Sequence, residues 1–170
     1  MPEPVRIRPE AVSDAAAIER VTRLAFEHQT QGERTEHLIV AALRRAGELA
    51  LSLVAEDAAG VVGHVAVSPV RIGTGAAGWY GLGPLSVLPR CQGRGVGSRL
   101  VAEALGKLRE RGAAGCVVLG RPAFYGRFGF RAEASLVLPG VPAAYFQAIS
   151  FDGPLPCGEV SYHESFTTRP

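Results

Sequence analysis

One stretch, residues 79 to 112, constrains the fold of this chain more than any other. It places a short apolar run, a turn dense in glycine and an amphipathic segment in direct succession. The run at 81 to 88 has the length and composition of a buried strand, and Pro84 inside it removes one donor from the ladder. We therefore predict a strand with a bulge or splayed edge, which leaves some backbone groups unpaired.

The turn that follows carries three glycines at alternate positions, Gly93, Gly95 and Gly97. Glycine allows positive φ angles and lets another molecule approach bare backbone. Apolar residues then recur at steps of three and four, which predicts the longest helix of the chain over about 94 to 111. At 1.5 Å per residue this helix would be ~27 Å long, and Gly112 would end it.

A helix that begins in such a turn offers free N–H groups and the positive end of its dipole, which together bind phosphate or pyrophosphate. Arg94 and Arg99 add positive charge. The simpler interpretation is that the glycines only form a tight turn between strand and helix. The spacing matches neither G-x-G-x-x-G nor a Walker loop, so an anion here would not be held as a nucleoside triphosphate is.

Residues 92 to 97 resemble the Q/R-x-x-G-x-G/A signature of the GNAT superfamily of N-acyltransferases, preceded by the family's L-x-V-x-P at Leu85, Val87 and Pro89. A second block at 116 to 130 resembles the family's next strand and its Y-x-x-x-G-F element. Nearly the whole chain resembles the YhbS-like group of predicted acetyltransferases. Where many members of that group carry Asp and Tyr, this chain has Arg121 and Phe124, departures that concern the acceptor side.

The resemblance implies an α/β (α+β) fold, with a mixed, mostly antiparallel sheet of six or seven strands, a splayed central opening and helices on both faces. Residues 1 to 170 would form one domain. It implies transfer of an acetyl group from acetyl-CoA, as cosubstrate and without a metal, to a primary amine by direct attack. The residues it assigns to acetyl-CoA are Leu85, Ser86, Val87, Gln92, Gly93, Arg94, Gly95, Val96, Gly97 and Ser98.

Tyr125 occupies the position of the family's tyrosine general acid, which protonates the departing thiolate. From the residues alone, Tyr125 could equally be one more aromatic of a core patch.

The helix pair that would cover the acceptor side carries Glu27, His28, Glu33, Glu36 and His37 as candidates for acceptor recognition. The general base stays open among Glu27, Glu36, His64 and a water. A lone histidine in an apolar strand such as His64 is more often a core residue than a base.

The remaining pattern predicts a strand at 5 to 9, helices at 14 to 27 and 33 to 46, a hairpin of 49 to 56 with 61 to 72, a strand at 114 to 119, a short helix from 122, strands at 130 to 138 and 158 to 166, and one helical turn at 145 to 149. Ser13 or Asp14 would cap the first helix, and 29 to 32 would be loop.

Composition narrows the function classes. A net charge of +2 with scattered basic residues makes nucleic acid an unlikely partner. The 3 cysteines have no CxxC pair, which speaks against a disulfide framework or zinc site and for a reducing cytoplasm. No stretch approaches the ~20 apolar residues of a membrane span. The acceptor would be a small-molecule or peptide amine, and a homodimer is compatible with this pattern.

Two other classes remain compatible with the sequence. A binding-only module could keep the acyl-CoA groove for sensing or stability without turnover, and a nucleotide-binding α/β protein could use the same helix terminus. Turnover separates the first class from an enzyme, and ligand identity separates the second.

Overall fold

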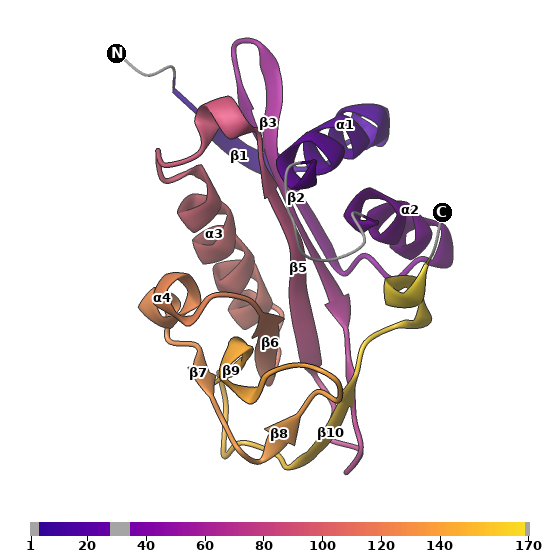
Figure 1. Ribbon diagram of the computed structural model, residues 1–170, viewed down its shortest axis with the longest axis vertical. Coiled ribbons are helices and arrows are strands. Elements are labelled where there is room, and N and C mark those ends of the chain that lie inside the picture. The colour runs from indigo at the N-terminus through magenta and orange to yellow at the C-terminus, as the bar shows by residue number, and fades with distance from the viewer. Residues whose placement is uncertain (1–3, 28–34, 169–170) are drawn as a thin grey trace.

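The computed structural model describes residues 4–27 and 35–168, in which a twisted seven-stranded sheet forms the centre of the molecule (Figure 1). Its strand order is β1-β2-β3-β5-β6-β9-β7. The strands are β1 (Arg6–Pro9), β2 (Leu51–Asp57), β3 (Gly60–Pro69), β5 (Trp79–Val87), β6 (Gly115–Leu119), β9 (Phe146–Ser150) and β7 (Arg131–Ala132). Neighbouring strands are antiparallel except β5 and β6, which are parallel. The predicted mixed, mostly antiparallel sheet is thus confirmed.

Helices cover both faces of this sheet, as predicted (Figure 1). The helices are α1 (Ala15–Phe26), α2 (Glu36–Ala46), α3 (Val96–Glu110) and α4 (Pro122–Tyr125). On one face, α3 buries an apolar stripe that includes Leu100, Ala104 and Leu108. On the other, α1 and α2 meet β2 through Ile18, Val40 and Val54.

The start of α3 and the N-terminal cap of α1 differ from the prediction. The helix α3 is the longest of the described helices, but it begins at Val96 because Gly95 takes a left-handed conformation. Its 15 residues span about 22 Å at 1.5 Å per residue. Asp14 makes no side-chain cap for α1; its carboxylate instead accepts the N–H of Ala11 and pairs with Arg8. The predicted loop at 29 to 32 and the start of the second helix at 33 lie outside the described residues.

The C-terminal third departs most from the predicted elements. The predicted helical turn at 145 to 149 is wrong: Ala143–Tyr145 is a single 3-10 turn, and residues 146 to 150 form β9 between β6 and β7. The predicted strand at 130 to 138 is split into β7 and β8 (Leu136–Val137). The strand β10 (Gly158–Ser161) pairs with β8 and with β4 (Arg71–Ile72) in a separate small sheet. Proline and glycine density predicted loop here, whereas pairing with distant strands decided the structure.

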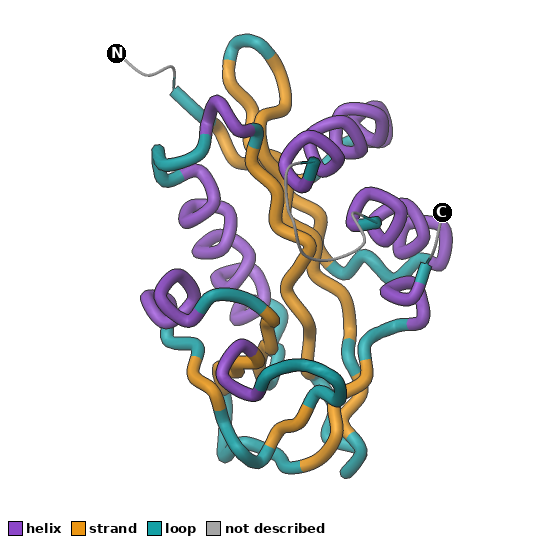
Figure 2. Tube along the Cα trace, viewed as in Figure 1, coloured by secondary structure: helices purple, strands orange, loops and turns teal. Residues whose placement is uncertain are grey.

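The sheet opens between β5 and β6 (Figure 2). These strands pair only from Trp79 opposite Gly115 to Leu82 opposite Val118. Beyond Leu82, β5 continues to Val87 and, among the described strands, pairs there with β3 alone. This is the splayed edge that Pro84 predicted.

No helix in the part of the chain that the structure describes has the length and apolar character needed to cross a bilayer.

Candidate active site

The backbone of β5 presents unpaired groups to the opening. Ser86 lies opposite His64 in the β3–β5 ladder, and the next hydrogen-bonded position, Leu88, donates its N–H to the Val62 carbonyl at 2.8 Å. Since amide groups in an antiparallel ladder alternate in direction, Ser86 bonds to β3, while the N–H groups of Leu85 and Val87 point away from it. Two of the three β5 residues predicted to hold a ligand therefore direct N–H groups into the opening.

The glycine-rich turn presents a second set of N–H groups. Gly93 and Gly95 have φ angles of 76° and 83°, which strain any other residue. None of the N–H groups of residues 93 to 98 donates to an acceptor within the described ranges, and the first bond of α3 runs from the N–H of Arg99 to the carbonyl of Gly95. The turn and the α3 N-terminus thus form a run of N–H groups suited to an anion.

Gly97 marks the point where three elements meet. A Cβ added there would lie 3.7 Å from Val87 Cγ2, 3.8 Å from Phe124 Cζ and 3.9 Å from Leu85 Cδ2. The end of β5, the start of α3 and the helix α4 are therefore in contact around one bare backbone position. Phe124, expected to concern the acceptor side, instead faces the glycine-rich turn.

Positive charge at the turn differs from the prediction at one position. Arg94 is exposed on the turn itself. The guanidinium of Arg99 points elsewhere, because it donates to the Val5 carbonyl at 2.7 Å. Its place is taken by Arg127, which donates to Ser98 Oγ at 2.8 Å and whose guanidinium lies 5.0 Å from the centre of the Phe124 ring. Arg127 was not among the predicted site residues, although it lies inside the Y-x-x-x-G-F element, which was the available signal.

Gln92, in the predicted set, supports the strand rather than the turn. Its side-chain Nε2 donates to the Val87 carbonyl at 2.9 Å. The Val87 carbonyl therefore already accepts a hydrogen bond from Gln92, whereas the Val87 N–H stays available to a ligand. Val96 is the first residue of α3, and its buried side chain leaves only its backbone at the turn.

Tyr125, the last residue of α4, lies just past the point where β6 leaves β5. Its ring covers the bare backbone of Gly120, so that a Cβ there would come within 2.4 Å of the ring carbon Cε2. Phe124 and Phe130 hold the ring by edge contacts, with ring centres 4.8 and 5.8 Å away. The hydroxyl bonds to none of the described residues and is not among the fully buried polar atoms.

The electrostatics of Tyr125 suit a proton donor. Burial raises the pKa of Tyr125 to about 12, against a smaller opposing effect of Arg121. The hydroxyl is therefore protonated at neutral pH.

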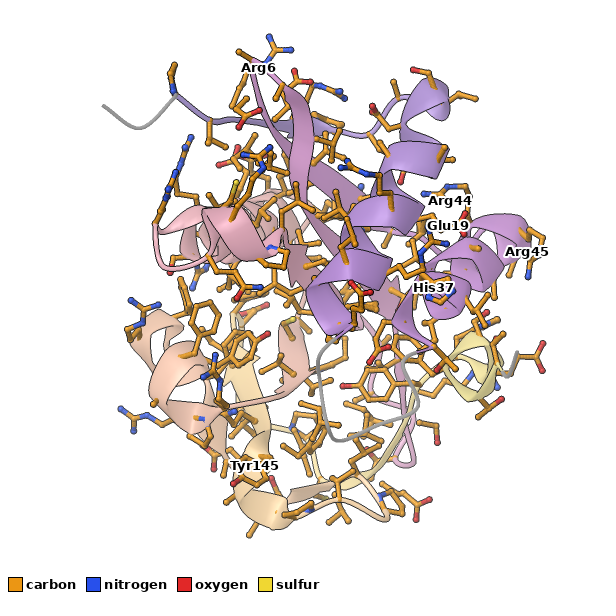
Figure 3. All side chains as sticks on the ribbon, turned by 45° about the horizontal axis from the view of Figure 1, so that its top comes forward. Arg6, Glu19, His37, Arg44, Arg45 and Tyr145 are labelled. Carbon is orange, nitrogen blue, oxygen red and sulfur yellow. The ribbon has the colours of Figure 1, made fainter. Side chains whose placement is uncertain are left out.

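The candidates for acceptor recognition and for the base are scattered. Glu27 is exposed at the end of α1, and His37 lies on α2 (Figure 3). Glu36 begins α2, and its Oε2 is buried with no partner among the described residues. His28 and Glu33 lie outside the described residues.

His64 is fully buried on β3, with its Nε2 at 2.8 Å from Ser52 Oγ. Burial lowers the pKa of His64 to about 4, so the ring is neutral at pH 7.

No group of three or more His, Cys, Asp or Glu within residues 4–27 and 35–168 could hold a metal ion. The three cysteines are free thiols, and burial raises the pKa of the Cys116 thiol.

The chain is similar to known acetyltransferases. A family model described as an acetyltransferase (GNAT) domain matches residues 48–132. The chain is 39% identical to the uncharacterized N-acetyltransferase YhbS of Escherichia coli K12, over 94% of this chain and 97% of that protein.

Two solved structures share the fold over almost their entire lengths. A GNAT family acetyltransferase from Brucella melitensis in complex with acetyl-CoA is 47% identical with a TM-score of 0.86, covering 97% of this chain and 99% of the other. The E. coli YhbS structure in complex with CoA is 37% identical with a TM-score of 0.88, covering 99% and 94%.

Proposed function

Because the chain belongs to the GNAT family of acetyltransferases, we propose that it transfers the acetyl group of acetyl-CoA to a primary amine of a small molecule or peptide by direct attack. The observation that carries this proposal is the opening between β5 and β6, beyond Leu82 and Val118, with free N–H groups on one side and the Tyr125 hydroxyl on the other. The Brucella and E. coli structures, which contain acetyl-CoA and CoA, support this ligand.

The two sets of N–H groups would divide the recognition of acetyl-CoA between them. The run at 93 to 98, with Arg94 and Arg127, would hold the pyrophosphate, because a helix N-terminus and two cations coincide there. The N–H groups of Leu85 and Val87 would bind the pantetheine arm and the thioester carbonyl oxygen. Donors aimed at this oxygen stabilise the negative charge that develops on it during attack.

Tyr125 would complete the reaction. The amine nitrogen forms a bond to the carbonyl carbon, the bond from that carbon to sulfur breaks, and sulfur leaves as a thiolate. The phenol proton of Tyr125 passes to this thiolate. The nitrogen, which is cationic after the attack, releases one proton to solvent as it becomes the amide nitrogen, and the tyrosinate regains a proton from solvent. A protonated phenol next to the opening supports this role.

The acceptor must reach the opening as a neutral amine, since an ammonium has no lone pair. Glu27, Glu36, His64 or a water could take its proton, and the Oε2 of Glu36 is buried with no partner among the described residues.

The test is release of free thiol from acetyl-CoA over a panel of primary amines, with ligand binding followed by thermal shift. We expect stabilisation by acetyl-CoA and not by ATP or NAD, and amine-dependent thiol release. Binding without thiol release for any amine would instead favour the binding-only module.

The variant Tyr125→Phe distinguishes a general acid from a tyrosine that only packs in the core. It removes one hydroxyl and keeps the ring contacts, so acetyl-CoA affinity should stay the same while turnover falls ~10²–10⁴-fold. Tyr145→Phe is the matched control, because that side chain is 46% exposed and lies away from α1 and α2 (Figure 3). Wild-type turnover in Tyr125→Phe would remove Tyr125 from the mechanism.

A further inference from the structure

A row of polar side chains crosses the sheet on the face that α1 and α2 cover. Ser86 on β5 lies opposite His64 on β3. His64 Nε2 lies 2.8 Å from Ser52 Oγ on β2, and Ser52 Oγ in turn donates to Glu10 Oε1. Glu10 ends the row in an ion pair with Arg44 of α2 at 3.0 Å. The row connects the strand that borders the opening with the edge of the molecule.

The contacts of Ser52 fix the form of His64. A serine hydroxyl has one proton, and Ser52 gives it to the Glu10 carboxylate. Ser52 can therefore only accept from His64, so the ring carries its proton on Nε2. This leaves Nδ1 with a lone pair that can accept a proton.

The atom that carries this lone pair and a hydroxyl on β5 are both without a partner among the described residues. His64 Nδ1 and Ser86 Oγ are both buried without a partner among the described residues, although the two residues are direct neighbours across the β3–β5 ladder. Such neighbours lie ~5.5 Å apart between Cα atoms, close enough to share one bridging group. Ser86 stands between Leu85 and Val87, whose N–H groups face the opening, so a shared group would lie next to the reacting atoms.

The surroundings contain few other charges. The residues of α1 buried on this face, Ile18, Val21 and Thr22, are uncharged, and the Thr22 hydroxyl is used by the Ile18 carbonyl. Burial is the largest effect on His64 and lowers its pKa; Glu10 raises the pKa, and Arg44 of α2 lowers it. The ring is thus held neutral, so it takes a proton on Nδ1 only as it releases the proton on Nε2.

We propose that Ser86, His64, Ser52 and Glu10 form a proton relay that takes the proton released by the acceptor amine. The proposal rests on the function proposed above. It selects His64 from the candidate bases and gives Glu10 and Ser52 a role in transfer.

Ser86 Oγ and His64 Nδ1 have no direct hydrogen bond, so the transfer between them runs through a bridging water. The acceptor ammonium loses one proton to Ser86 Oγ, the Ser86 proton moves to the water, and the water gives one of its own protons to His64 Nδ1. The ring releases its Nε2 proton to Ser52 Oγ, and the Ser52 proton moves to the Glu10 carboxylate. The carboxylate, whose side chain is 19% exposed, gives that proton to solvent. The neutral amine then attacks the thioester, and no oxidant or further reactant is needed.

Ser52→Ala is the decisive variant, because it cuts the row between His64 and Glu10 while removing one oxygen atom. Ser68→Ala is the matched control: Ser68 lies on the same strand as His64, is fully buried and also has no hydroxyl partner among the described residues, but it is not in the row. Acetyl-CoA affinity and melting temperature are measured for both variants.

The probes are benzylamine, an ammonium at pH 7.5, and aniline, which is similar in shape and already neutral at that pH. We expect kcat/KM of Ser52→Ala to fall at least tenfold with benzylamine and less than twofold with aniline. The deficit with benzylamine should shrink as pH rises toward the pKa of that amine. Ser68→Ala should match the wild type with both probes. Equal losses of Ser52→Ala with both amines, or no loss, would overturn the relay.

If the wild type acetylates neither probe, the proposed function fails for these amines. The relay is then tested by the protonation state of the His64 imidazole. Nitrogen-15 NMR of His64 should show the proton on Nε2, with an Nδ1 signal that changes in Ser86→Ala. A proton on Nδ1, or an Nδ1 signal unaffected by Ser86→Ala, would overturn the relay.

Discussion

Arg127 Nη2 donates a 2.8 Å hydrogen bond to Ser98 Oγ, although the residues are 29 positions apart. Ser98 belongs to the first turn of α3, and Arg127 follows α4 on the other side of the opening. The bond holds the Arg127 guanidinium beside the free N–H groups of residues 93 to 98, although Arg127 belongs to a different segment of the chain from the glycine-rich turn.

Arg127→Ala should weaken acetyl-CoA binding about tenfold, which corresponds to ~1.4 kcal/mol, because one cation near the pyrophosphate is lost. The salt dependence of the dissociation constant should also become shallower. Titration calorimetry at two salt concentrations measures both effects. Arg99→Ala is the control, since its guanidinium bonds to the Val5 carbonyl, and its affinity should equal that of the wild type. Equal weakening in the two variants would contradict the placement of Arg127.

Gly95→Val and Gly97→Val should abolish acetyl-CoA binding. At Gly95, a φ angle of 83° disfavours any β-branched residue, so the turn would change shape. At Gly97, a larger side chain would enter the space between Val87 and Phe124. Gly106→Ala, inside α3 with nothing near its Cβ position, should bind normally and be more stable by up to ~1 kcal/mol. Unchanged affinity in a folded Gly97→Val protein would rule out the turn as the binding site.

The phenol of Tyr125 should titrate late. Its pKa is raised to about 12 by burial, so it stays protonated at pH 10, where ordinary tyrosines are half ionised. An ultraviolet difference titration of wild type against Tyr125→Phe should therefore show no tyrosinate from this residue until the pH exceeds 11. A difference signal centred near pH 10 would show that the hydroxyl is as hydrated as an exposed one.

Gly120→Ala should impair turnover without contact to any substrate. The added methyl would lie within 2.4 Å of the Tyr125 ring, so the ring must move away from its position at the opening. We expect a loss of kcat of about tenfold or more with the acetyl-CoA dissociation constant unchanged. Gly126→Ala, one residue after Tyr125 with open space at its Cβ position, serves as the comparison. A Gly120→Ala enzyme with wild-type kcat would mean that the position of the ring is not critical.

Asp14 should make the protein sensitive to acid. Hydrogen bonds from Arg8 and from the N–H of Ala11 lower the pKa of Asp14 from 3.8 to about 2. A carboxyl with a lowered pKa stabilises the fold fully above its unfolded pKa, and this contribution, up to about 2 kcal/mol, is lost as pH falls from 4 through 2. Urea unfolding at several pH values should show this loss in the wild type and in Asp152→Asn, whose side chain is exposed, but not in Asp14→Asn.

The sequence allowed the middle of the molecule to be predicted well, because its signals are local. Pro84 and the glycines at 93 to 97 act on their own backbone, so the splayed strand and the start of the next helix followed from chemistry within a few residues. The strand at 146 to 150 could not be found this way. It lies between proline-rich segments and is a strand because β6 and β7 pair with it on its two sides.

The same distinction holds for the site. The family pattern gave the backbone positions that face the opening, whereas the bond from Arg127 to Ser98 and the row from His64 to Glu10 join residues 29 and up to 54 positions apart. Nothing in the local sequence around Glu10 distinguishes it from other surface charges, and the Y-x-x-x-G-F element that contains Arg127 leaves the residue at that position unspecified. Only the fold brings their partners within reach.

The four residue pairs that join β5 to β6 have a mechanical consequence. Past Leu82 the sheet is two panels hinged at one end, with β1, β2, β3 and β5 in one panel and β6, β9 and β7 in the other. A ligand that accepts hydrogen bonds from the N–H groups of Leu85 and Val87 and packs against the second panel would connect the two panels where the strands do not pair. Ligand binding should then restrict their relative motion, and amide hydrogen exchange of the whole β6–β9–β7 panel should slow together with that of β5.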